Sequence, residues 1–255
     1  MNLHSLIIGD GDKHLIVLHG FLGMGNNWKS YALVWSQLGF KVHLIDQRNH
    51  GRSFWSDEFD YKILSDDIFK YMIDLKISSS IIIGHSMGGK TAMNFALNHQ
   101  KMITKLIIVD ISPRKYIQNN QDILEGLGSM DFGLIKSRKE ADKYLLSKVP
   151  EIEFRNFLLK NLYWNNSDSL SLRLNINVLK KSSSIYESVS SDNSFKGPVL
   201  FIKGEMSDYI IDEDKSLIKN LFPRAKIQII KNAGHWVHVE NKIDFSTVVQ
   251  NFLKL

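Results

Sequence analysis

The chain has 255 residues, of which 44% are hydrophobic and 23% charged, a composition that is ordinary for a globular protein and argues against disorder. It contains no cysteine, which excludes disulfides, thiolate metal sites and a cysteine nucleophile. The net charge is +5, but only seven of the 32 basic residues are arginines, and the lysines are scattered. The charge therefore indicates a solvated surface rather than a nucleic-acid or membrane partner.

The N-terminal residues 1–9 carry no basic leader, and their apolar stretch is short. No run approaches the roughly 20 apolar residues that span a bilayer. These features predict a cytoplasmic, soluble protein with no membrane span. The length fits one large domain or one domain with an inserted subdomain.

Short apolar runs bounded by turn residues predict strands, and most of them are rich in Ile, Val and Leu without polar alternation, as in a parallel sheet covered on both faces. In chain order they are Leu3–Ile8, Leu15–Leu18, Val42–Ile45, Ile81–Ile83, Leu106–Val109, Val199–Ile202 and Ile227–Ile230. Helical spacing between and after them predicts helices over Asn27–Leu38, Tyr61–Leu75, Met87–Asn98, Asp212–Leu221 and Lys242–Leu253. The alternation predicts an α/β fold with a doubly wound, mostly parallel sheet, and we expect the first two strands to make an antiparallel start.

One stretch interrupts this alternation. Residues 112–196 show no convincing strand and predict only short helices and joints between them. The helices are Gln121–Gly128, Arg138–Leu146, Glu151–Leu162 and Ser169–Lys180, and the joints are Asn165–Ser167 and Ser182–Ser184. We expect residues 1–111 and 197–255 to form a catalytic domain, and residues 112–196 to form an inserted helical cap over the carboxyl edge of the sheet, where such sheets bind ligands.

The run Gly84-His85-Ser86-Met87-Gly88 matches the pattern G-x-S-x-G. A predicted strand precedes it and a predicted helix follows it, which is the setting of a nucleophile elbow. Glycines two positions either side of Ser86 remove clashes in such a tight turn. The serine would then stand at a helix N-terminus, where the dipole favours a developing negative charge. Ser86 is the predicted nucleophile.

An ester-cleaving serine needs two backbone N–H groups that face the oxyanion. We expect one from Met87, directly after the serine, and one from Phe21, in the loop after the strand that ends at Leu18. His19, which begins that loop, is interpreted as a buried structural histidine.

His235 follows the last predicted strand and Gly234, in a loop from which a base can reach over the edge of the sheet. It is the predicted general base. The rival His238 is expected on the first turn of the structure that leads to Glu240.

Two acids compete to orient the imidazole. The acid usually lies three residues after the glycine that follows the strand Val199–Ile202, and Ser207 occupies that position after Gly204. Asp208 lies one residue later. Asp110 ends the strand beside the elbow strand. We place Asp110 slightly ahead of Asp208, with Ser207 as an accessory hydrogen-bonding partner of the histidine.

These residues together resemble the α/β-hydrolase superfamily over the whole chain. The motifs that carry the resemblance are His19-Gly20-Phe21, Asn27-Trp28, the run Asp46–Ser53, Gly84–Gly89 and Gly234-His235. The run Asp46–Ser53, read as Asp-x-Arg-Asn-His-Gly-x-Ser, looks like the small bacterial YbfF-type esterases and the related animal mitochondrial abhydrolase-domain proteins. That resemblance implies an aspartate like Asp110 as the acid, a serine like Ser207 in its usual place, and no metal or cofactor.

Asp46, Arg48 and His50 in the run Asp46–Ser53 are candidates for substrate binding. The favoured interpretation is a structural unit, whose side chains bond to one another and to loop backbone and shape the wall near the oxyanion loop. Phe21, Trp28, Trp164 and Trp236 are candidate acyl-pocket residues, although packing is the favoured explanation for each of these lone aromatics.

The sequence thus predicts a serine carboxylic-ester hydrolase, an esterase of lipase-like type with a catalytic triad. Its expected partner is a small-molecule substrate, a small to medium acyl ester or an acyl-CoA thioester. Alternatives with the same triad are a carbon–carbon bond hydrolase and a perhydrolase, whereas a hydrolase-fold receptor would bind small molecules without turnover.

Overall fold

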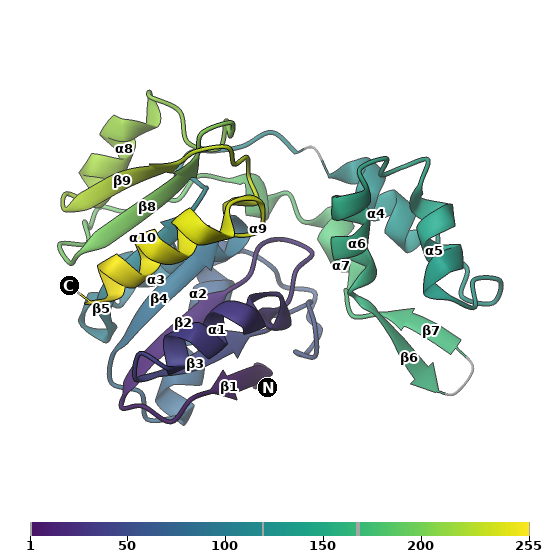
Figure 1. Ribbon diagram of the computed structural model, residues 1–255, viewed down its shortest axis with the longest axis horizontal. Coiled ribbons are helices and arrows are strands. Elements are labelled where there is room, and N and C mark those ends of the chain that lie inside the picture. The colour runs from purple at the N-terminus through teal and green to yellow at the C-terminus, as the bar shows by residue number, and fades with distance from the viewer. Residues whose placement is uncertain (1, 119, 167–168, 255) are drawn as a thin grey trace.

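Seven strands form the central sheet of the larger lobe in a computed structural model, which describes residues 2–118, 120–166 and 169–254 (Figure 1). β1 runs antiparallel to its neighbour, and the remaining pairs are parallel. In spatial order the strands are β1 (Ser5–Ile8), β3 (Phe40–Ile45), β2 (Lys13–Leu18), β4 (Ser80–His85), β5 (Ile103–Val109), β8 (Val199–Gly204) and β9 (Ala225–Ile230). The predicted fold class is confirmed.

The expected pairing of the first two strands is wrong, because β1 pairs with β3 and not with β2. Residues Leu15–Leu18 of β2 are completely buried, so this strand needs a neighbour on each side. β2 therefore lies inside the sheet, whereas β1, whose Ile7 is 45% exposed, forms the edge.

Helices cover both faces of the sheet, as Figure 1 shows. On one face, α2 (Tyr61–Asp74), α3 (Met87–Asn98) and α8 (Asp214–Leu221) share an apolar core with the strands. On the other face, α1 (Lys29–Ser36) and α10 (Lys242–Lys254) bury large rings such as Trp35 and Phe245. Each buried side chain of the size of Phe contributes about 1.5–3 kcal/mol through removal from water. The short helices of this lobe are η1 (Gly25–Trp28), η2 (Gln100–Met102) and α9 (Val237–Glu240).

The smaller lobe is built between β5 and β8 and has an apolar core of its own. Its elements are α4 (Gln121–Gly128), α5 (Arg138–Leu145), α6 (Ile152–Leu159), β6 (Leu162–Asn166), β7 (Ser169–Leu172), α7 (Ile176–Lys181) and η3 (Ser184–Tyr186). We call this lobe the cap.

The prediction of an all-helical cap is wrong at one place, because β6 and β7 pair as an antiparallel two-stranded sheet. The sequence Ser-Leu-Ser-Leu at the start of the expected helix Ser169–Lys180 buries Leu170 and Leu172 on one side, which is the two-residue period of a strand. In the expected joint Asn165–Ser167, the first two residues belong to β6, and Ser167 lies outside the described residues.

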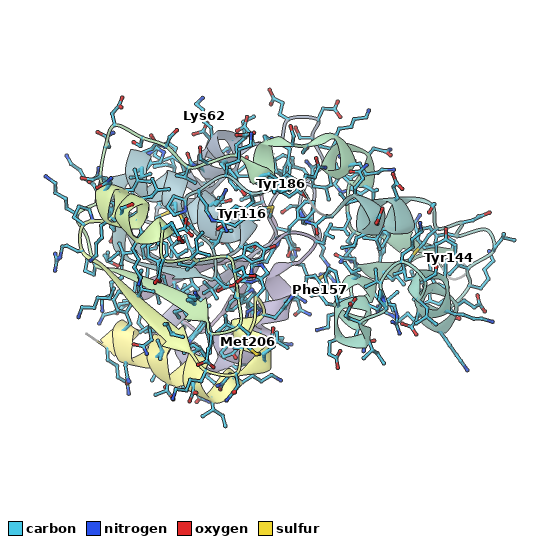
Figure 2. The ribbon with its side chains drawn as sticks, turned by 90° about the horizontal axis from the view of Figure 1, so that it is seen from above. Lys62, Tyr116, Tyr144, Phe157, Tyr186 and Met206 are labelled. Carbon is cyan, nitrogen blue, oxygen red and sulfur yellow. The ribbon has the colours of Figure 1, made fainter. Side chains whose placement is uncertain are left out.

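Two linkers connect the cap to the sheet lobe and run side by side, one through Pro113 and Tyr116 and the other through Tyr186 and Val189. The Tyr116 N–H donates to the Tyr186 carbonyl at 2.8 Å, and the Val189 N–H donates to the Pro113 carbonyl at 2.7 Å. Figure 2 shows Tyr116 and Tyr186 at the junction of the two lobes. No helix in the described ranges is long and apolar enough to cross a membrane.

Candidate active site

The turn between β4 and α3 holds Ser86 in a left-handed backbone conformation with φ 51° and ψ −117°. Glycines make this turn possible: a Cβ on Gly84 would lie 2.2 Å from the Gly88 carbonyl oxygen, and a Cβ on Gly88 would lie 2.3 Å from that of Leu18. Ser86 therefore stands at the N-terminus of α3, where the helix dipole favours negative charge.

The His235 imidazole lies against the buried carboxylate of Asp110. His235 Nδ1–H donates to Asp110 Oδ2 at 2.8 Å, and the Gly204 N–H donates to Asp110 Oδ1 at 3.0 Å. Asp110 is completely buried, so its negative charge is held by these bonds and not by water. This arrangement fixes the proton on Nδ1 and leaves Nε2 of the imidazole as an acceptor.

Ser207 lies beside this pair, and its hydroxyl donates to Asp110 Oδ2. From the sequence, we expected Ser207 to bond to the histidine. In the structure it bonds instead to the carboxylate oxygen that also accepts from the histidine, because Asp110 and Ser207 end neighbouring strand–loop units on β5 and β8.

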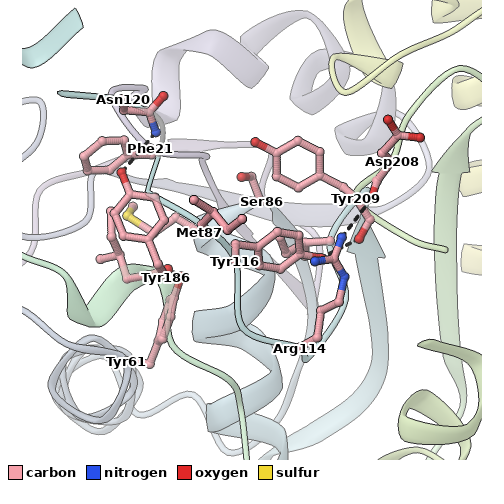
Figure 3. Close-up of a pocket in the computed structure, with 13 residues that line it drawn as sticks. Phe21, Tyr61, Ser86, Met87, Arg114, Tyr116, Asn120, Tyr186, Asp208 and Tyr209 are labelled. Atoms are coloured by element: carbon pink, nitrogen blue, oxygen red, sulfur yellow. Dashed lines mark hydrogen bonds between the residues drawn. The ribbon is translucent and has the colours of Figure 1, made fainter. Parts of the chain in front are cut away.

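Asp208, the competing acid, is exposed, and its backbone carbonyl accepts a hydrogen bond from Arg114 at 2.9 Å. Figure 3 shows its carboxylate pointing away from Ser86. The geometry thus brings Asp110, rather than Asp208, to the imidazole.

Ser86 and His235 line the same pocket of about 240 Å³, together with Phe21, Tyr209 and Trp236. The Tyr209 ring stacks on the imidazole, with 3.7 Å between ring centroids and 18° between planes. His85 Nε2–H donates to the His235 backbone carbonyl at 3.0 Å. These contacts hold the His235 ring in place over the pocket.

The loop after β2 turns back over the serine. The Gly23 N–H donates to the Gly20 carbonyl at 3.0 Å, which makes Phe21 and Leu22 the centre of a tight turn. The Phe21 amide takes no part in that turn bond, and the Met87 amide is the first of α3, where helix N–H groups have no intrahelical partner. Both residues line a cavity with Ser86.

Known proteins resemble this chain in sequence and in fold. A family model described as "alpha/beta hydrolase fold" matches residues 13–131. The mouse protein named sn-1-specific diacylglycerol lipase ABHD11 is 36% identical to this chain, over 98% of this chain and 84% of its own length. This chain belongs to the α/β-hydrolase family. The predicted resemblance is confirmed.

A second relative of this α/β-hydrolase chain is bacterial. The Escherichia coli protein named esterase YbfF is 26% identical, over 94% of this chain and 92% of its own length. A solved structure titled "Marine microorganism esterase" has a TM-score of 0.95 and 38% identity, over 98% of this chain and 99% of that chain.

In this α/β-hydrolase chain, the run Asp46–Ser53 supports the loop that carries Phe21, as the structural interpretation predicted. Asp46 Oδ1 accepts from the Gly25 N–H at 2.7 Å, and His50 Nε2 accepts from the Leu22 N–H at 3.3 Å. Arg48 donates two hydrogen bonds to the Asp67 carboxylate, at 2.6 and 2.7 Å. The run thus holds the backbone of the loop and does not line the pocket of Ser86.

Two further histidines have structural positions. Burial lowers the pKa of His19 to about 4, and its Nε2 accepts from the Gln47 N–H at 3.0 Å. Burial is the main cause that lowers the pKa of His238 to about 3, and the nearby His235 is the second cause. The His238 ring stacks on the Trp28 ring, with 4.2 Å between ring centroids. Both rings are therefore neutral at pH 7: the His19 ring hydrogen-bonds to loop backbone, and the His238 ring packs against Trp28.

A cavity of about 280 Å³ lies next to Ser86. Figure 3 shows tyrosine rings around it, which we did not predict from the sequence. The Tyr61 hydroxyl donates to the Ile185 carbonyl at 2.6 Å, and the Tyr116 hydroxyl donates to the Tyr209 carbonyl. Since these hydroxyls are bonded to backbone, the rings present apolar surface to the cavity. Two of the four tyrosines, Tyr116 and Tyr186, come from the connections to the cap, whose folding the chain pattern does not reveal.

The candidate aromatic residues divide into two groups. Phe21 and Trp236 line the pocket of Ser86, and the Trp236 ring meets Phe157 of α6 at 4.3 Å. Figure 2 shows Phe157 at the side of the cap that faces the sheet lobe. Trp28 is buried in packing contacts, and Trp164 lies on the cap hairpin, 53% exposed.

Lys90, one turn into α3, is the second feature that sequence reasoning missed. Its side chain is 1% exposed, and its ammonium group donates to the carbonyls of Arg114 at 2.7 Å and Glu187 at 2.5 Å. It lies 4.7 Å from the centre of the Tyr116 ring. Burial, followed by the Arg114 charge, lowers the pKa of Lys90 to about 7. Lys90 therefore joins both cap linkers to the helix that carries Ser86.

Within the part of the chain that the structure describes, no group of three His, Asp or Glu side chains is placed to hold a metal ion.

Proposed function

We propose that this chain is a serine carboxylic-ester hydrolase that acts through an acyl-enzyme. One observation carries the proposal: the Nδ1–H of His235 is bonded to the buried Asp110 carboxylate, while the same imidazole shares a pocket with Ser86. An imidazole held in this tautomer accepts a proton at Nε2, which is what an attacking serine hydroxyl requires.

In the first half-reaction, Ser86 Oγ attacks the acyl carbonyl, and its proton goes to His235 Nε2. The Asp110 carboxylate stabilises the imidazolium that forms and remains ionised. The carbonyl π-electrons move onto oxygen, and the amides of Phe21 and Met87 bind that oxyanion. When the tetrahedral intermediate collapses, the bond to the leaving group breaks, and His235 returns the proton to the departing oxygen or sulfur.

In the second half-reaction, water attacks the acyl-enzyme. His235 takes a proton from the water, the same two amides bind the second oxyanion, and Ser86 leaves with the proton from the imidazolium. The products are a carboxylic acid and the free serine.

The substrate class follows from the cavity beside Ser86. Its volume of about 280 Å³ is at the small end of ligand pockets, and its tyrosine rings offer apolar walls. We assign it to a small to medium acyl chain or an alcohol group of similar size. Oxygen esters are the leading class, as in the relatives named esterase and diacylglycerol lipase, and acyl thioesters are the second.

The test is turnover of a panel of p-nitrophenyl esters of increasing acyl length, together with acyl thioesters. Ser86→Ala should lose activity by about 10⁴-fold or more, because the nucleophile is removed. The matched control is Ser216→Ala, an exposed position on α8, which should retain the parent rate. If no ester or thioester shows turnover that depends on Ser86, the proposal fails.

A further inference from the structure

A second cavity lies behind the oxyanion loop, between the edge of the sheet lobe and the hairpin of the cap. Its volume is about 470 Å³, larger than the cavity beside Ser86, and it is lined by Met24 and Arg52 of the sheet lobe and by Lys160, Trp164 and Arg173 of the cap. In Figure 1 the β6–β7 hairpin extends below the cap helices, on the same side of the molecule as β1. The cavity does not include Ser86 or His235.

The charges around this cavity are strongly unequal. Four cationic side chains line it, those of Arg52, Arg138, Lys160 and Arg173, against one carboxylate, that of Asp46. The Asp46 carboxylate is bonded at both oxygens, since Oδ1 accepts from the Gly25 N–H at 2.7 Å and Oδ2 accepts from the Arg52 N–H at 2.9 Å. The local balance is therefore positive, and Asp46 has little capacity left to neutralise it.

Three of these cationic side chains have N–H donors that are available to a ligand. Within the described ranges 2–118, 120–166 and 169–254, the side chains of Arg52 and Lys160 are exposed and make no hydrogen bond or ion pair with the protein. The Arg173 guanidinium lies 4.3 Å from the centre of the Tyr163 ring, a stacking contact that leaves its N–H edge available. Arg138, in contrast, donates to the carbonyls of residues 159 and 162 and serves the fold of the cap.

An exposed indole stands at the same cavity. Trp164 is 53% exposed, although large apolar rings normally pack away from water. Planar rings, nucleobases among them, stack on such aromatic surfaces. The cavity volume lies within the range of about 300–1,000 Å³ that is usual for small-molecule sites.

We propose that this cleft is a binding site for a phosphate-bearing small molecule, separate from the ester-cleaving site. The arginine side chains match the geometry of phosphate oxygens, Lys160 adds a point charge, and Trp164 offers a stacking surface for a planar ring attached to the phosphates. A nucleoside diphosphate has both groups. Because Arg52 belongs to the sheet lobe and Lys160 and Arg173 belong to the cap, the bound ligand bridges the two lobes.

Calorimetric titration of the full chain at low ionic strength tests this, with pyrophosphate, ADP and adenosine as separate probes. The first variant is Arg52→Gln with Lys160→Gln, both at exposed positions, so the fold is retained and thermal denaturation checks it. The matched control removes the same charge elsewhere, by Arg224→Gln with Lys242→Gln. Arg173→Gln and Trp164→Ala test the remaining contacts.

We expect the parent chain to bind pyrophosphate and ADP saturably. The affinity for both should fall about tenfold or more in the Arg52→Gln, Lys160→Gln variant, because charge-assisted hydrogen bonds are lost. The affinity should be unchanged in the control variant. ADP should bind more tightly than pyrophosphate, and Trp164→Ala should remove that difference. Absence of saturable binding overturns the proposal, as does equal weakening in the two double variants, which would show only general charge attraction. Equal affinity for ADP and pyrophosphate overturns the role of Trp164. Ester turnover by the variants, measured in parallel, keeps this result separate from that of the proposed activity.

Discussion

Replacing Asp110 by asparagine keeps the shape of the side chain and removes its charge. The Gly204 N–H donates to Asp110 Oδ1, so in the variant the amide oxygen must remain at that position. The amide NH₂ group then takes the place of Oδ2, where it faces the donors His235 Nδ1 at 2.8 Å and Ser207 Oγ. Because two donors cannot bond to each other, the imidazole has to move its proton to Nε2.

The wrong tautomer cannot accept the proton of Ser86. The Ser-His-Asp template puts the loss in kcat at about 10⁴-fold, which corresponds to about 5 kcal/mol of transition-state stabilisation. KM should change little, because Asp110 does not reach the substrate. The fold should persist, since a neutral amide costs less to bury than an isolated charge.

The assay is hydrolysis of the best ester of the p-nitrophenyl panel by Asp110→Asn and by Asp208→Asn, which serves as the matched control. Asp208 is exposed and its carboxylate points away from Ser86, so its variant should stay within about twofold of the parent. Circular dichroism confirms that both variants are folded. If Asp208→Asn loses orders of magnitude and Asp110→Asn does not, the assignment of the acid is refuted.

Three further changes have clear expectations. Ser207→Ala removes one donor to the carboxylate beside the base, so kcat should fall about tenfold at unchanged KM, and parent-like kcat would argue against its role. Gly88→Ala places a methyl group 2.3 Å from the Leu18 carbonyl oxygen, so the free energy of unfolding measured in urea should fall by about 1–3 kcal/mol. The control Gly126→Ala should not show this loss, because the nearest atom there is 3.4 Å from the added methyl group. Burial lowers the pKa of Lys90 to about 7, so between about pH 7 and 9 the unfolded chain binds more protons and stability rises with pH. Lys90→Met should remove about 1.4 kcal/mol per pH unit from that slope, and parallel stability curves would contradict this.

The sequence by itself determined the features that depend on neighbouring residues. Unbroken Ile, Val and Leu runs favour burial on both faces, and they correctly predicted the parallel strands inside the sheet, although β1 is an antiparallel edge strand. Gly84 marks a tight turn by a constraint between neighbouring residues, since a Cβ there would meet the Gly88 carbonyl oxygen. The order of serine, acid and histidine along the chain restricted the base to the loop of His235.

Only the tertiary structure decided between alternatives that depend on distant contacts. Asp110 and His235 are 125 residues apart, and their meeting depends on the order of strands β4, β5, β8 and β9 in the sheet, which no local pattern states. The edge position of β1 likewise depends on the whole sheet, because the more apolar strand β2 occupies the interior position.

Part of the wall of the cavity beside Ser86 comes from the packing of the cap linkers, where Lys90 binds two backbone carbonyls at once. The basic cleft exists because the β6–β7 hairpin of the cap stands opposite Arg52. Periodicity and turn chemistry act over a few residues, whereas these sites depend on which surfaces meet when the whole chain packs.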